Sequence, residues 1–140
     1  MNKAGPVIVI EDNEADRFLF EEVFEQLNYP NELLFFTDGL EALKFLTAMD
    51  ITPFLILSDI NMPKLNGIEL HRKLKTDASL NLRCIPYLFF STSVDQQAVI
   101  NSYSISVQGF FLKDGEVNGL EENTRSIMDY WYLCATPNNF

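Results

Sequence analysis

The sequence is poor in the features that mark secreted, disulfide-stabilised and membrane-spanning proteins. It has two cysteines in 140 residues, Cys84 and Cys134, and their wide separation matches no metal or redox motif. We expect ordinary reduced thiols and assign them no function. No apolar run approaches the roughly 20 residues that cross a bilayer, and residues 1–6 lack the apolar core of a secretory signal. The expectation is a cytoplasmic protein that does not engage a membrane.

Positive charge and histidine are also scarce. The chain has 10 basic against 20 acidic residues, a formal net charge of −10 that opposes binding to a nucleic-acid backbone. The single histidine, His71, has no His, Cys or acid at metal-ligand spacing, so we expect a surface or amphipathic role for it. Acidic side chains that cluster can instead bind a divalent cation.

What the sequence does contain is an alternation of short apolar runs with segments of helical period. This pattern is typical of a parallel sheet covered by helices on both faces. The runs are rich in Val, Ile, Leu and Phe: Pro6–Ile10, Leu33–Thr37, Phe54–Ser58, Tyr87–Phe90 and Gly109–Leu112. Joined by right-handed crossovers, they predict an α/β fold with an open, doubly wound sheet of five parallel strands.

Apolar stripes predict five helices between and after the strands, of which the last is the longest. The stripes lie within Phe20–Leu27, Leu40–Leu46, Ile68–Leu74, Val94–Tyr103 and Val117–Trp131. Residues that commonly cap helices precede the first four: Asn13, Asp38, Asn66 and Ser93. With no linker or repeat in the alternation, we expect one domain over residues 1–140, a core at about 6–133, a short tail at 134–140 and no output domain.

Polar residues stand where the predicted strands end: Glu11 and Asp12, Asp38, Asp59, Ser91 and Lys113. Ligands of open α/β sheets bind outside the carboxyl ends of the strands. Singly, each residue reads as a turn, cap or surface residue. Four of the five strand ends, all except that of Asp38, are predicted to converge on one site.

The residues of this predicted site suit phosphoryl transfer. Three carboxylates, Glu11, Asp12 and Asp59, repel one another unless a cation intervenes, and Mg²⁺ prefers such oxygen ligands. With Lys113 and Mg²⁺ the formal charge sums to zero. Asp59 is then placed to act as a nucleophile, with Lys113 and the Ser91 hydroxyl to bind phosphoryl oxygens.

Four segments carry a resemblance to a known family: Val7–Asn13, Ser58–Gly67 with its Met-Pro and later Gly, Ser91–Ser93, and Phe110–Lys113. From about Val7 to Trp131, the chain resembles the receiver domains of two-component response regulators, which have a flavodoxin-like fold of strand order 2-1-3-4-5. Within this family it is most similar to short single-domain regulators that are partnered with phytochrome-like or other sensor histidine kinases.

The resemblance implies a phosphorelay protein rather than an enzyme with an external substrate. Asp59 would accept a phosphoryl group, giving an aspartyl phosphate, and Glu11, Asp12, Asp59 and the backbone carbonyl of Asn61 would bind Mg²⁺. Ser91 and Phe110 would act as switch residues. They would change the surface of the fourth helix, fifth strand and fifth helix. The implied partners are a sensor histidine kinase or phosphotransfer protein, a downstream protein target and, as an open alternative, a second copy in a homodimer.

Three alternatives remain open. Asp114 and Gly115 follow Lys113 where the family usually has Pro, which motivates the alternative of a degenerate receiver that binds proteins without phosphorylation; the intact triad of Glu11, Asp12 and Asp59 argues against it. A flavodoxin-like cofactor protein would need a Gly/Ser/Thr-rich loop after the first strand, where this chain has Glu11 and Asp12. An aspartyl-phosphate hydrolase would need acid/base groups and a substrate lid, and no insertion in this sequence is long enough to form such a lid.

Overall fold

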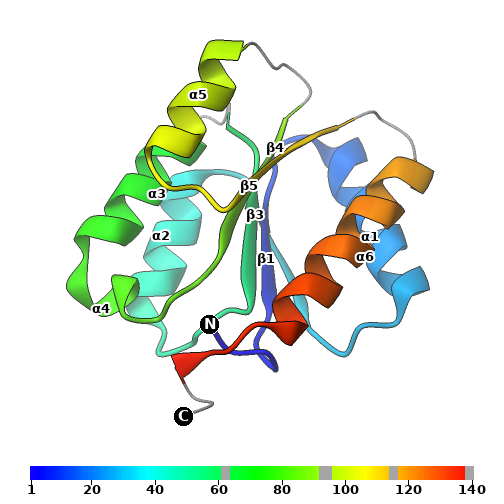
Figure 1. Cartoon of the computed structure of the whole chain (residues 1–140), viewed down its shortest axis with the longest axis horizontal. Coiled ribbons are helices and arrows are strands. Elements are labelled where there is room, and N and C mark those ends of the chain that lie inside the picture. The colour runs from blue at the N-terminus through cyan, green and yellow to red at the C-terminus, as the bar shows by residue number, and fades with distance from the viewer. Residues whose placement is uncertain (61–63, 92–95, 114–116, 138–140) are drawn as a thin grey trace.

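The computed structural model describes residues 1–60, 64–91, 96–113 and 117–137. Its centre is a sheet of five parallel strands in the order β2-β1-β3-β4-β5 (Figure 1). The strands are β1 (Val7–Ile10), β2 (Leu33–Phe36), β3 (Leu55–Ser58), β4 (Tyr87–Ser91) and β5 (Gly109–Leu112). The predicted fold class, strand order and positions of the strands are therefore confirmed.

Helices cover both faces of the sheet, as predicted. They are α1 (Glu14–Leu27), α2 (Gly39–Ala48), α3 (Gly67–Thr76), α4 (Ala78–Asn81), α5 (Gln96–Ser104) and α6 (Val117–Leu133). The four-residue α4 was not predicted, so the predicted fourth and fifth helices are α5 and α6. Among the described residues, no helix is long and apolar enough to cross a membrane.

Alternate residues of the strands supply two separate halves of the core. Val7 and Val9 of β1 belong to the half that packs under α1 and α6, which lie together on one side of the sheet (Figure 1). Ile8 and Ile10 of the same strand belong to the half under α2 and α3. Met1, outside the predicted core, is buried with the first half. The central strands are thus apolar on both faces, which is why they read as continuous apolar runs.

Capping side chains fix where the helices begin, close to the ends of the strands. The Asn13 side chain accepts a hydrogen bond from the Asp16 amide (3.0 Å), and Asp38 accepts one from the Glu41 amide (2.9 Å). Asn66 and Glu69 form a reciprocal capping box at the start of α3. The fourth predicted cap residue, Ser93, lies outside the described part of the chain.

His71 takes the amphipathic role rather than the surface role. It lies on the buried side of α3 and is only 3% exposed. Its imidazole packs edge-on against the ring of Tyr87, with 5.0 Å between the ring centroids. Burial lowers the pKa of His71 to about 4, with a smaller contribution from the charge of Lys75.

Candidate functional site

Three acidic side chains meet at the carboxyl end of the sheet. Glu11 directly follows β1 and Asp59 directly follows β3; the Asp59 amide donates to the Ile10 carbonyl (3.0 Å) and so holds the two ends in register. Glu11, Asp12 and Asp59 each present a carboxylate oxygen within 4.8 Å of those of the other two. The structure therefore brings the three predicted carboxylates together.

Lys113, directly after β5, places its ammonium group among these acids. Its Nζ lies 3.3 Å from Asp59 Oδ2 and in closer contact with Glu11 Oε2. The side chain of Lys113 is 7% exposed, that of Glu11 2% and that of Asp59 15%. Because water is largely excluded, these charges interact more strongly than an ion pair on the surface.

The environment of the site shifts the pKa values of Lys113 and Glu11. Burial alone would lower the pKa of Lys113, but the hydrogen bond to Glu11 and the charges of Glu11, Asp59 and Asp16 hold this pKa above its usual value. Burial raises the pKa of Glu11, and the hydrogen bond and charge of Lys113 oppose this increase only in part. Lys113 therefore offsets the cost of burying the Glu11 carboxylate only in part.

A fourth acid, Asp16, belongs to the site and was missed in the sequence. Its Oδ2 lies 3.2 Å from Lys113 Nζ. Asp16 stands in the first turn of α1, three residues after the cap residue Asn13. The sequence did carry a signal for it: Asp16 is an acid at the third position of the helix that follows β1 and its site residues. With Asp16 included, the zero charge tally predicted for the site becomes minus one.

The other predicted site residues lie where their strands place them. Ser91 ends β4 and is 1% exposed, and its carbonyl accepts a hydrogen bond from the Lys113 amide (3.0 Å). Phe110 is half-buried on β5, and its ring packs edge-on against Phe89 with 6.0 Å between centroids. Asp38 has a different role from the acids of the cluster: its side chain caps α2 and forms an ion pair with Lys64 (3.7 Å).

Some predicted features fall outside the described residues. These are the Asn61 carbonyl, Ser93, Asp114 and Gly115.

The cluster of Glu11, Asp12 and Asp59 fits a hard divalent cation. All three donors are carboxylate oxygens, the ligands that Mg²⁺ prefers, and Asp12 is exposed, which leaves room for the water ligands that Mg²⁺ usually retains. The raised pKa of Glu11 points the same way, because a cation at this position would supply the positive charge that Lys113 alone does not.

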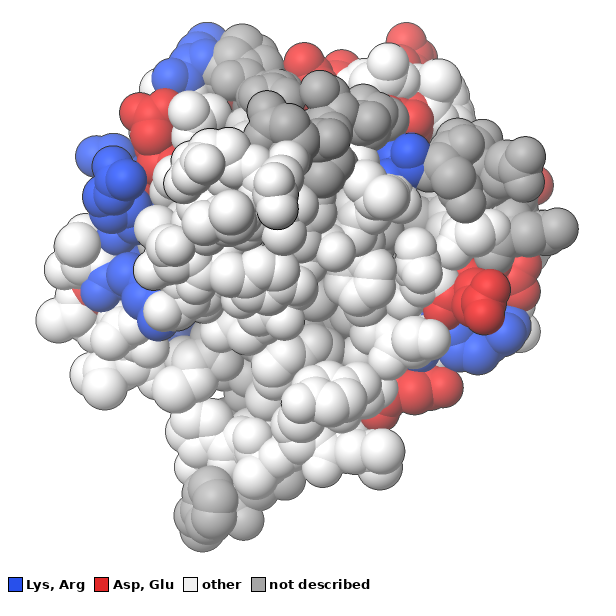
Figure 2. Space-filling model, turned by 45° about the horizontal axis from the view of Figure 1, so that its top comes forward, with Lys and Arg blue, Asp and Glu red and all other residues white. Residues whose placement is uncertain are grey.

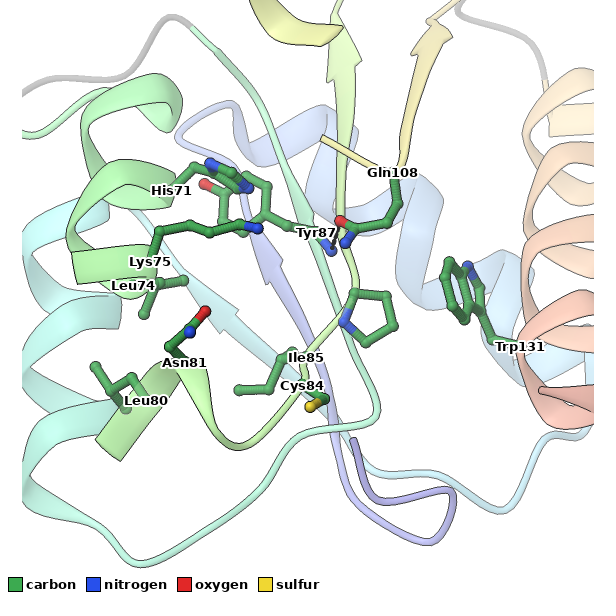
Figure 3. A pocket seen from close by; sticks show the side chains of 11 residues that line it. His71, Leu74, Lys75, Leu80, Asn81, Cys84, Ile85, Tyr87, Gln108 and Trp131 are labelled. Carbon is green, nitrogen blue, oxygen red and sulfur yellow. Dashed lines mark hydrogen bonds between the residues drawn. The ribbon is translucent and has the colours of Figure 1, made fainter. Parts of the chain in front are cut away.

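A separate pocket of about 360 Å³ lies at the opposite end of the sheet (Figure 3). It is lined by Pro86, just before β4, and Gln108, just before β5, with His71 and Lys75 of α3 on one side and Trp131 of α6 on the other. The Gln108 side chain accepts a hydrogen bond from the Tyr87 amide (2.9 Å). None of the acids of the cluster lines this pocket, so the two sites are distinct.

Comparison with known proteins identifies the family. A sequence model of the response regulator receiver domain matches residues 7–125. The chain belongs to this family. Receiver domains act in two-component signalling, so the predicted family and the coarse function are confirmed.

Individual receivers match over nearly the whole chain. Response regulator Rcp1 of Synechocystis sp. is 31% identical over an alignment that covers 96% of this chain and 94% of that protein. The crystal structure of a phosphorylated cyanobacterial phytochrome response regulator, RcpA, superimposes with a TM-score of 0.83 at 30% identity and covers 94% of this chain and 97% of its own. A Mn²⁺-bound structure of Rcp1 has a TM-score of 0.80 at 30% identity, with the same coverage.

Proposed function

We propose that this receiver accepts a phosphoryl group on Asp59 in a Mg²⁺-dependent reaction. The observation that carries the proposal is the arrangement of Asp59 beside two further carboxylates and within 3.3 Å of the Lys113 ammonium. In such a site the Asp59 carboxylate can attack phosphorus, and the ammonium group of Lys113 can bind phosphoryl oxygens. The Mn²⁺-bound structure of Rcp1 supports a divalent cation in a receiver similar to this one.

In the proposed reaction, a carboxylate oxygen of Asp59 attacks the phosphorus of a phosphohistidine on the donor protein. The new P–O bond forms as the P–N bond breaks, and its electron pair remains on the imidazole nitrogen of the donor. Lys113 and the Ser91 hydroxyl donate hydrogen bonds to the transferring oxygens. Glu11, Asp12, Asp59 and the Asn61 carbonyl would hold Mg²⁺, which neutralises charge on the phosphoryl group when bound.

We propose a sensor histidine kinase or a phosphotransfer protein as the donor. Similarity to RcpA, which is a phytochrome response regulator, favours a kinase with a phytochrome-type sensor. A further solved neighbour, with a TM-score of 0.84 and 27% identity, is a response regulator in red light signalling of R. palustris. Incubation with purified phytochrome kinases and with kinases of other sensor types tests this assignment through the rate of phosphoryl transfer.

The surface of α5, β5 and α6 is the proposed output surface. It exposes Ile100 and Tyr103 of α5, Leu112 of β5 and Tyr130 of α6. Figure 2 shows charged side chains at the margins of this face and mostly uncharged ones at its described centre. Phosphorylation would move Ser91 and Phe110 and thereby bias this surface toward a downstream protein or a second copy.

Intact-mass spectrometry tests the central proposal. With acetyl phosphate and Mg²⁺, the wild type should gain one phosphoryl group, and Asp59→Asn should gain none. Chelation of the metal should abolish the gain. Amide NMR shifts of the phosphorylated wild type should then map to α5, β5 and α6. No phosphorylation from any donor would instead favour a receiver that binds partners independently of phosphorylation.

A further inference from the structure

We propose that Asp16 is a positioning residue that competes with the phosphoryl group for Lys113 and so slows phosphorylation of Asp59. This inference rests on the proposed function of Asp59. The structural basis is the shared ammonium group: Lys113 Nζ lies 3.2 Å from Asp16 Oδ2 and 3.3 Å from Asp59 Oδ2.

All the donors of Lys113 have acceptors before any phosphoryl group arrives. A lysine ammonium has three N–H donors. Glu11, Asp16 and Asp59 each place a carboxylate oxygen within reach of them. A phosphoryl oxygen that binds Lys113 must therefore take a donor from one of these acids. Asp16 is the most exposed of the three, at 29%, against 2% for Glu11 and 15% for Asp59. Since water can replace the lost bond most readily at Asp16, this contact is the one that breaks.

The backbone holds Asp16 in this competing position. The Asp16 amide donates to the Asn13 side chain (3.0 Å), and the Asn13 amide donates to Glu11 Oε1 (3.1 Å). Arg17, the next residue, donates from Nη1 to the Glu11 carbonyl (3.0 Å). The first turn of α1 thus fixes the backbone of Asp16 relative to Glu11, which keeps the Asp16 side chain within reach of Lys113.

The charge of Asp16 acts in the same direction. Glu11, Asp12, Asp16 and Asp59 with Lys113 carry a net formal charge of minus three, or minus one after a divalent cation binds. Conversion of the Asp59 carboxylate to an acyl phosphate dianion adds one more negative charge. Removal of the Asp16 charge therefore favours the phosphorylated site and attracts an anionic donor.

The test compares Asp16→Asn, which removes the charge at nearly constant shape, with Asp16→Glu, which keeps it. Glu14→Gln is the matched control, because Glu14 is an exposed acid of the same helical turn and makes no ion pair with Lys113 among the described contacts. Each variant reacts with acetyl phosphate and Mg²⁺, whose reaction forms the Asp59–phosphorus bond and releases acetate. We expect Asp16→Asn to react faster on the order of tenfold, and Asp16→Glu to stay within about twofold of wild type. The advantage of Asp16→Asn should decrease as salt screens the charge.

Equal or slower phosphorylation of Asp16→Asn would overturn the proposal, as would an equal acceleration by Glu14→Gln. If the wild type itself is not phosphorylated, the proposed function fails instead. A second readout does not need phosphorylation or metal: the NMR signal of the Lys113 ammonium group. In Asp16→Asn its protons should exchange faster with water than in wild type and in Glu14→Gln, and unchanged exchange would overturn the contact itself.

Discussion

Replacement of Lys113 by methionine tests whether one ammonium group holds the acidic site together. Methionine keeps most of the carbon stem, so the change removes charge while it preserves much of the packing. The variant leaves Glu11, which is 2% exposed, without its close cationic partner. Removal of one partner from a buried ion pair typically costs about 3 to 5 kcal/mol.

The structure places the expected loss at the lower end of this range. Asp59 and Asp16 are 15% and 29% exposed, so water screens part of their repulsion once Lys113 is gone. We therefore expect Lys113→Met to lower the free energy of unfolding by about 3 kcal/mol in metal-free buffer. The control is Lys44→Met on α2, whose pair with Glu41 is long (3.8 Å) and exposed at both ends. Lys44→Met should lower the free energy of unfolding by no more than about 0.5 kcal/mol.

Urea unfolding with EDTA and then with Mg²⁺ measures both effects. Magnesium should stabilise Lys113→Met more than the wild type, because the bound cation no longer meets a neighbouring ammonium group. If Lys113→Met lowers the free energy of unfolding by less than about 1 kcal/mol in EDTA, the Lys113–Glu11 pair contributes no more than an exposed ion pair. That result would refute the claim that Lys113 holds the buried acids together. Equal stabilisation of both proteins by magnesium would show that the cation and Lys113 do not act on the same carboxylates.

Three further predictions concern residues around the site and the fold. His71 has a pKa of about 4 in the folded chain against 6.5 as the ordinary value, so the unfolded chain takes up the proton first. The free energy of unfolding should therefore fall by on the order of 3 kcal/mol as the pH drops from 6.5 to 4. Urea unfolding at several pH values measures this loss, and His71→Gln should lack the part of it that is due to His71. Gly67→Ala should lower the free energy of unfolding by about 2 kcal/mol, although alanine has the better helix propensity. The reason is that the new Cβ would lie 2.5 Å from the Asp59 carbonyl oxygen. Stability equal to wild type would mean that the backbone at Asp59 moves away at no cost. Asn66→Ala removes the capping box of α3 and should cost about 1 kcal/mol, a loss that thermal unfolding detects and that Asn66→Asp should largely avoid.

The strands were predictable because each is a short apolar run that ends at a polar residue. The run Leu33–Thr37 corresponds to β2 at Leu33–Phe36, and Gly109–Leu112 matches β5 at both ends. In the central strands β1, β3 and β4, burial on both faces also removes the polar alternation that would interrupt such runs. By contrast, α4 spans four residues, too few to show a periodic stripe. Its cap Asp77, which also ends α3, was the only local sign of it.

The burial of His71 was also within reach of the sequence. The buried residues of α3 are Gly67, Leu70, His71 and Leu74, which have the spacing of one helix face. His71 therefore completes an apolar stripe. Because histidine is intermediate in its tendency to be buried, residue type alone did not place it. Position within the stripe was the better guide.

Asp16 shows where inference from strand ends stops. The rule that ligands bind at the carboxyl ends of parallel strands identifies Glu11, Asp59 and Lys113, because each directly follows a strand. It does not identify a side chain that a helix brings back over the same edge, and it does not say which acids a long lysine side chain will contact. Those contacts depend on competition among charges in three dimensions. Asp16 enters this competition and adds a negative charge to a site whose predicted charge was balanced. In the proposed reaction, the first turn of α1 would therefore help to set how readily Asp59 accepts a phosphoryl group.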